Sequence, residues 1–145
     1  MKIEVKIDTA SLDKKLSHIQ KAISQAVEEA VTKSAYKVEG DAKVNCPVDT
    51  SRLRDSIHTE FDFSNNNHVA IIGTDVEYAS IIELYGSGMY NPNSSKPNGW
   101  VYKDAKGNYR FTKGQQARPF LYPALKQNEQ DIKNYIIHSI KSHIK

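Results

Sequence analysis

The apolar positions of the chain follow two periods, one typical of helices and one typical of strands. A stripe at spacings of three and four, with no proline before Pro47, predicts one amphipathic helix over residues 10–43, about 50 Å long. The stripe consists of Leu12, Leu16, Ile19, Ile23, Ala26, Val27, Ala30, Ala35, Val38 and Ala42. Such a helix is longer than the core of a 145-residue domain is wide, so another subunit can cover part of its stripe.

Segments in which polar and apolar side chains alternate predict strands. Residues 2–7 alternate charged and branched apolar side chains, as in a short edge strand. Residues 57–73 read as a hairpin with a turn at "SNNN", and the apolar run in its return strand favours a central position. Residues 100–112 read as a second hairpin that carries aromatic residues on both arms.

Three shorter patterns predict the remaining helices. A short helix after Pro47, capped by Asp49 or Thr50, carries Arg52, Leu53 and Arg54. A second begins at Asp75 and ends at Gly86. Its expected buried stripe is Tyr78, Ile81, Ile82 and Tyr85. A C-terminal helix of about 20 residues repeats apolar residues at helical spacing. These residues are Leu121, Leu125, Ile132, Ile136 and Ile140.

Together these patterns predict one α+β domain over residues 1–145. An antiparallel sheet, made of the two hairpins and the N-terminal strand, packs against the long N-terminal helix, the short middle helix and the C-terminal helix. Residues 86–99 are rich in Gly, Pro, Asn and Ser and are expected to form a flexible loop.

The segment "ARPFLYPAL", residues 117–125, combines large apolar residues with two prolines, which neither a regular strand nor a helix interior tolerates. Pro123 suits the first turn of the last helix, and each proline favours an extended residue before it. We expect a rigid structural anchor that buries Phe120 and Leu121. Its members are Arg118, Pro119, Phe120, Leu121 and Pro123. A purely intramolecular role and a direct interface role both remain open.

Composition and charge narrow the classes of function. The hydrophobic fraction of 39% and the charged fraction of 26% are those of a soluble globular protein, and no apolar run is long enough for a membrane span. Cys46 is the single cysteine and reads as a small buried residue. The net charge of +3 is too small to indicate a nucleic-acid binder, but residues 45–84 carry 2 basic and 7 acidic residues and residues 85–121 carry 6 and 1. These surfaces of opposite charge either neutralise each other within one molecule or meet between copies.

No catalytic arrangement emerges from the sequence. There is no phosphate-binding loop, no histidine pair at metal-ligand spacing and no expected cofactor. Glu60 and Asp62 fall on the solvent side of their strand. Glu83 stands beside the loop, where a structural hydrogen bond or a salt bridge to Arg118 explains it better than catalysis, so a hydrolase ranks third among the hypotheses.

A nucleic-acid-binding module ranks second. Its case rests on basic residues interleaved with Trp100, Tyr102, Tyr109 and Phe111. The basic residues are Lys96, Lys103, Lys106, Arg110, Lys113 and Arg118. The preferred interpretation is that the aromatics fill a core face while the cations face water.

Three motifs in order, "PVDTSRLRDSI" (47–57), "VAIIGTDVEYASIIELYGSG" (69–88) and "ARPFLYPAL" (117–125), carry a resemblance. The chain resembles the small neck proteins of long-tailed double-stranded DNA bacteriophages, the tail-completion or head–tail joining proteins common in prophages. The positions that match that pattern are Leu53, Arg54, Ser56, Ile57, Tyr78, Ala79, Glu83, Gly86, Pro119, Phe120, Leu121, Pro123 and Ala124. Leu84 and Tyr85 separate Glu83 from Gly86, where the family usually has one residue.

The resemblance implies a non-enzymatic structural subunit. It would form a ring of six between the capsid connector and the tail tube, with passage of DNA through the ring and no contact with a membrane. Its place would be the host bacterial cytoplasm during assembly and then the virion neck. The candidate interface with itself and with connector and tail-tube proteins comprises Gly86, Gly88, Asn93, Lys96, Trp100, Lys103, Lys106 and Arg110.

Overall fold

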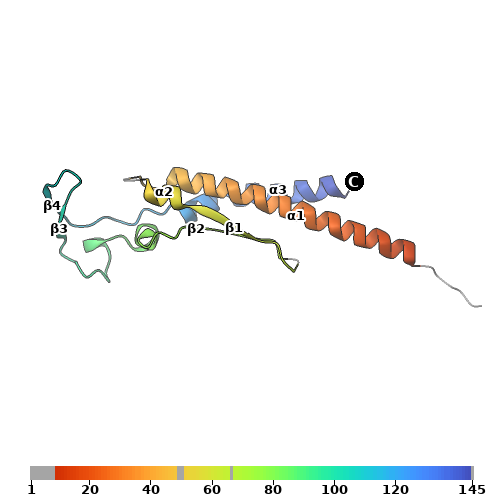
Figure 1. Ribbon diagram of the computed structural model, residues 1–145, viewed down its shortest axis with the longest axis horizontal. Helices are drawn as coiled ribbons and strands as arrows, with labels where there is room; N and C mark the ends of the chain where they lie inside the picture. The colour runs from red at the N-terminus through yellow and green to blue at the C-terminus, as the bar shows by residue number, and fades with distance from the viewer. Residues whose placement is uncertain (1–8, 49–50, 66, 145) are drawn as a thin grey trace, which may run out of the picture.

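A computed structural model describes residues 9–48, 51–65 and 67–144 (Figure 1). The strand expected at residues 2–7 and the caps expected at Asp49 or Thr50 lie outside these ranges. The elements are α1 (Ala10–Asn45), α2 (Arg52–Ser56), β1 (His58–Asp62), β2 (Val69–Gly73), the π-helical turn η1 (Ile81–Tyr85), the 3₁₀ turn η2 (Gly88–Tyr90), β3 (Trp100–Lys103), β4 (Tyr109–Thr112) and α3 (Leu121–His143). The predicted α+β class, with its helices and hairpins, is confirmed. The two hairpins form separate two-stranded sheets.

The two long helices set the shape of the molecule. α1 and α3 pack side by side and run in opposite directions, and the C-terminus lies partway along α1 (Figure 1). Ala30, Ala35 and Ala42 are buried on α1, and small side chains at these positions let the helix axes approach. The 36 residues of α1 span about 54 Å, so its first turns extend past the end of α3. Leu12 and Leu16 in this overhang are exposed.

A buried amide ties the two long helices together. Asn128 of α3 is almost fully buried, and its Nδ2 donates to Asp41 Oδ2 of α1 at 2.6 Å. This bond and the nearby Lys37 ammonium stabilise the charged carboxylate, so the pKa of Asp41 lies below its ordinary value. The contact fixes the relative register of the two helices where they cross the core.

One face of the β1–β2 hairpin packs against α1. On that face the Thr59 hydroxyl donates to Glu39 Oε2 at 2.6 Å, and the Phe61 ring packs edge-on against Tyr36 with centroids 5.6 Å apart. Val69 and Ile71 point to the other face and are exposed. The predicted central position of this strand is wrong, because β2 pairs only with β1 among the described residues.

The turn before Gly86 differs from the helix predicted there. Val76 and Ala79 are buried, whereas Tyr78, Ile81 and Tyr85 are more than a third exposed, so the predicted buried stripe is wrong at these three positions. Its fourth member, Ile82, is half-buried and packs against the core. The reason lies in the backbone: the Gly86 N–H donates to the Ile81 carbonyl, five residues back, at 2.7 Å. A π-helical turn advances each residue by a smaller angle than an α-helix does, so an α-helical spacing assigns its faces incorrectly.

The centre of the core lies where α3 begins. Phe120 is completely buried, with 0% of its surface exposed, beside Ile57 and Leu53, and Leu121 packs half-buried against the same cluster. Pro123 lies in the first turn of α3, as expected. Tyr122, expected to be extended before Pro123, is instead helical, because the first turn of α3 continues through it.

Replacing Phe120 tests the importance of this centre. We expect Phe120→Ala to lower the free energy of unfolding by about 3–5 kcal/mol, because it leaves a cavity in packed core. Urea denaturation measures the change. The matched control is Tyr122→Ala, which truncates an exposed aromatic two residues later and should cost less than about 1 kcal/mol. Equal losses in the two variants would contradict the assignment.

Candidate functional site

The most distinctive part of the molecule is the excursion between η1 and α3. Residues 86–117, called the arm below, leave the end of the helical body and carry the β3–β4 hairpin at their far end (Figure 1). Apart from η2 and this hairpin, the arm has no regular structure.

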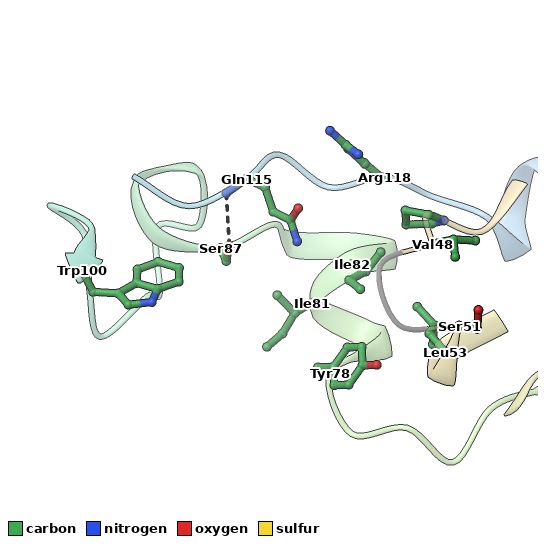
Figure 2. Close-up of a pocket in the computed structure, with 11 residues that line it drawn as sticks. Val48, Ser51, Leu53, Tyr78, Ile81, Ile82, Ser87, Trp100, Gln115 and Arg118 are labelled. Atoms are coloured by element: carbon green, nitrogen blue, oxygen red, sulfur yellow. Dashed lines mark hydrogen bonds between the residues drawn. The ribbon is translucent and has the colours of Figure 1, made fainter. Parts of the chain in front are cut away.

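Backbone hydrogen bonds join the two sides of the arm at its base. The Ser87 N–H donates to the Gln115 carbonyl at 2.8 Å, and the Met89 N–H donates to the Lys113 carbonyl at 2.9 Å. The Gln115 N–H donates in turn to the Ser87 hydroxyl at 3.1 Å (Figure 2). Next to the body, the Arg118 N–H donates to the Ile82 carbonyl at 2.7 Å. The arm therefore leaves the body as a paired ribbon.

Glycine makes this pairing sterically feasible. Gly86 has a φ of 70°, and a Cβ there would lie 2.6 Å from the Gln115 carbonyl oxygen. Gly88 has a φ of 61°, and a Cβ there would collide with the Lys113 carbonyl. Both residues were expected at an interface, but both are buried in the base of the arm. Their positive φ angles and close contacts give them a structural role.

The carboxylate of Glu83 holds the start of α3. Its Oε2 accepts hydrogen bonds from the N–H groups of Phe120 at 2.7 Å and Leu121 at 3.1 Å, and its Oε1 accepts from Tyr122 at 2.9 Å. These amides have no partner within the helix, and a negative charge beside them is favoured by the helix dipole. Of the two expected roles for Glu83, the structural hydrogen bond is confirmed, and the structure shows no ion pair with Arg118 among the residues it describes.

This cap explains how the arm is positioned. Glu83 lies in η1, just before the arm, and its partners begin just after the arm. Sequence reasoning missed the cap because the interacting residues are separated by 37 positions. A sequence signal does exist: Phe120, at the N-cap position, has no side-chain oxygen to cap the helix, so an acceptor from elsewhere is required.

A cavity of about 500 Å³ lies where the arm meets the body (Figure 2). Its lining is mainly apolar and includes Leu53, Tyr78, Ile81 and Trp100, together with Arg118. No carboxylate or imidazole is found among the described residues that line it, so they offer no acid–base pair. Nearby, burial raises the pKa of the Cys46 thiol, which disfavours the reactive thiolate.

The tip of the arm is exposed on both sides. Tyr109 is 77% exposed and Phe111 is 61% exposed. The register places Tyr102 opposite Arg110 and Lys103 opposite Tyr109, so each face carries both a cation and an aromatic ring. The interpretation that the aromatics fill a core face is therefore wrong, since the hairpin projects from the body and has no core beneath it.

Most of the remaining candidate interface residues lie on the surface of the arm. Trp100 is half-buried, with the Lys96 ammonium 5.4 Å from its ring centroid. Arg110 pairs with Asp104 at 3.2 Å within the hairpin. The carboxylate of Asp104 also accepts from the backbone of Asn108, and these bonds keep its pKa low. The exposed members are Asn93, Lys96, Lys103, Lys106 and Arg110.

The family-motif residues lie in the body below the arm. Leu53, Ile57 and Ala79 are buried, whereas Arg54 pairs with Asp55 at 3.1 Å on the surface. The Ser56 hydroxyl contacts the Thr74 hydroxyl at 2.5 Å and so joins α2 to the end of β2. Three of the motif residues therefore serve packing, and Ser56 joins two elements by a hydrogen bond.

Two kinds of site do not occur in the part of the chain that the structure describes. No three His, Cys, Asp or Glu side chains there gather closely enough to hold a metal ion. None of the helices described has the length and apolar character to cross a membrane.

An elongated α+β chain with an exposed, rigidly based arm has the geometry of an assembly subunit. A family described as "Bacteriophage HK97-gp10, putative tail-component" matches residues 10–84, just over half of the chain. The protein belongs to this HK97-gp10-like family of phage tail components. The family match confirms the resemblance to phage tail-completion proteins that the sequence motifs indicated. No curated protein and no solved structure matches the chain. The matched region covers α1 to β2 and most of η1, whereas the arm and α3 lie beyond it.

The cap can be tested by changing Glu83. We expect Glu83→Ala to lower the free energy of unfolding by about 2 kcal/mol, and Glu83→Gln, which keeps one acceptor oxygen, by less. Hydrogen exchange should also quicken at the amides of Ser87, Met89 and Gln115, since the base of the arm loosens. Glu129→Ala removes an exposed carboxylate on α3 and serves as the control. If Glu129→Ala lowers the free energy of unfolding as much as Glu83→Ala does, Glu83 has no special role at the start of α3.

Proposed function

We propose that this phage structural protein is a ring-forming subunit that completes the end of the tail or joins the head to the tail. In this proposal the chain acts as a single domain of residues 1–145 and has no catalytic activity. It contacts the connector and tail-tube proteins, and DNA passes through the ring. It assembles in the host bacterial cytoplasm and ends in the virion neck.

The observation that carries the proposal is the exposed apolar surface of the arm. Tyr109, Phe111 and Met89 are all more than half exposed, on a segment whose base is fixed by Glu83. Tyr109 and Phe111 share one face of the hairpin with the exposed Val101, and exposed apolar patches of this kind mark contact sites. Because the arm is pre-positioned, docking it costs less conformational entropy than docking a free loop.

Within the arm, residues 86–99 are assigned to the tail or connector partner. Asn93 and Lys96 are exposed there, beside Met89 and Tyr90. The anchor of Arg118, Pro119, Phe120, Leu121 and Pro123 keeps the other end of the arm in place through the buried Phe120. The anchor therefore acts by positioning the contact surface.

Mixing the purified protein with tail tubes or connector rings and imaging the product by electron microscopy tests the function. We expect the protein to bind one end of these particles. The Met89→Ser/Tyr90→Ser variant should reduce the bound fraction about tenfold, since apolar anchors dominate such contacts. The control Ile137→Ser changes an exposed apolar residue on α3 and should bind normally. Failure of the unmodified protein to associate at any salt concentration would refute the proposal.

A nucleic-acid-binding role is the second candidate, and the exposed tip of the arm favours it. Lys103 and Arg110 lie beside unburied aromatic rings, an arrangement that suits single-stranded nucleic acid. In this case the Lys103→Glu/Arg110→Glu variant should lose binding to a single-stranded oligonucleotide, and the unmodified protein should bind with a steep salt dependence. Fluorescence anisotropy measures both, and salt-independent or absent binding counts against this function.

A further inference from the structure

Two exposed surfaces of opposite charge share no ion pair with each other among the residues that the structure describes. The first, called the acidic face, is the outward side of β1–β2, formed by Glu60, Asp62, Val69 and Ile71. The second is the β3–β4 hairpin at the tip of the arm, with Lys103, Lys106 and Arg110 among its aromatic residues. Each surface therefore combines charge with exposed apolar groups.

The acidic face is built by the register of its hairpin. Glu60 is paired with Ile71, and Asp62 is paired with Val69, so one strand supplies carboxylates and the other supplies apolar groups. The Glu60 side chain is 72% exposed, and its ion-pair partner among the described residues is His58 at 3.5 Å, which carries a charge only when protonated. Ile71 is 61% exposed. This face thus offers carboxylates beside an apolar strip.

The β3–β4 hairpin has the complementary composition. Val101 and the rings of Tyr102, Tyr109 and Phe111 are exposed. The cations of Lys103 and Lys106 pair with no carboxylate in the described chain. Its strands have four residues each against five in β1 and β2, so both surfaces are about 15 Å long. The two surfaces therefore carry charges of opposite sign and are similar in length.

The arm cannot bring its tip back onto its own acidic face. It points away from the body at the opposite end from the β1–β2 turn (Figure 1). The Glu83 cap and the bond between Arg118 and Ile82 fix its base. Among the described residues, no ion pair joins residues 45–84 to residues 85–121. A second copy can supply the missing partner.

We propose that the β3–β4 hairpin of one copy docks on the acidic face of the next copy. Such a contact joins two different surfaces and repeats from copy to copy, so it forms a ring if the rotation closes and a filament if it does not. The contact deepens the proposed function, and its closure into a ring rests on that function. Each contact is small, so isolated copies associate weakly and assemble cooperatively once several contacts form.

A charge-swap experiment tests the contact. Sedimentation velocity over a concentration series should show that Glu60→Lys and Lys103→Glu each weaken self-association about tenfold. The double variant Glu60→Lys/Lys103→Glu should restore it, because every contact then pairs the swapped charges. Controls of the same charge change on α3, Glu129→Lys and Lys133→Glu, should associate like the unmodified protein. A double variant as weak as the two single effects combined would overturn the proposal.

A cross-linking experiment detects self-association that is too weak to measure by sedimentation velocity. Under mild oxidation, a mixture of the Glu60→Cys and Lys103→Cys variants should give mainly the mixed disulfide dimer, whereas Glu129→Cys with Lys103→Cys should give only statistical products. The native Cys46 thiol is buried and does not compete. An unmodified protein that stays monomeric, together with no excess of the mixed dimer, overturns the contact.

The same variants distinguish this contact between copies from binding of the arm to other partners. If Lys103→Glu abolishes binding to tail tubes or an oligonucleotide but leaves self-association unchanged, the hairpin serves that partner and the proposal is wrong. If the charge-swap pattern holds but no binding to tails or connectors occurs, the contact stands and the proposed function fails. If binding to tails persists but the charge-swap pattern is absent, the proposed function stands and the contact between copies is wrong.

Discussion

The position of the arm depends on one carboxylate. Glu83 accepts hydrogen bonds from the first amides of α3, and these amides belong to the residues that place Phe120 in the core. A helix start without its own capping side chain would leave donors unsatisfied, and here the acceptor comes from the turn just before the arm. One interaction therefore closes a loop of more than thirty residues and couples the arm to the most buried part of the body.

The arm and the rest of the described chain, called the body, have different roles. The body buries small and branched side chains between α1, α3 and the first hairpin, and the matched family region lies largely within it. The arm buries glycine backbone at its base and, apart from the half-buried Trp100, exposes its aromatic side chains. Stability thus resides mainly in the body, and the surface available to partners lies mainly in the arm, an arrangement suited to a structural component of a phage tail.

The sequence predicted the elements that depend on local pattern. Both long helices, both hairpins and the burial of Phe120 follow from periodicity, turn residues and proline positions. It did not predict which faces become buried, because that depends on what lies opposite: Tyr109 and Phe111 have no core beneath them, and Ile71 has no covering layer. The Glu83 cap joins distant residues, so no window of sequence contains it, and the π-helical turn shifts the faces that an α-helical spacing assigns to Tyr78 and Ile81.

The overhang of α1 carries a separate consequence. The turns that contain Leu12 and Leu16 lie beyond the end of α3 and bear no part of the core. Adding or removing whole turns there would alter the span of the protein by about 5.4 Å per turn while leaving the packed region intact. The length of this segment therefore sets how far the chain reaches beyond its core without affecting how the core packs.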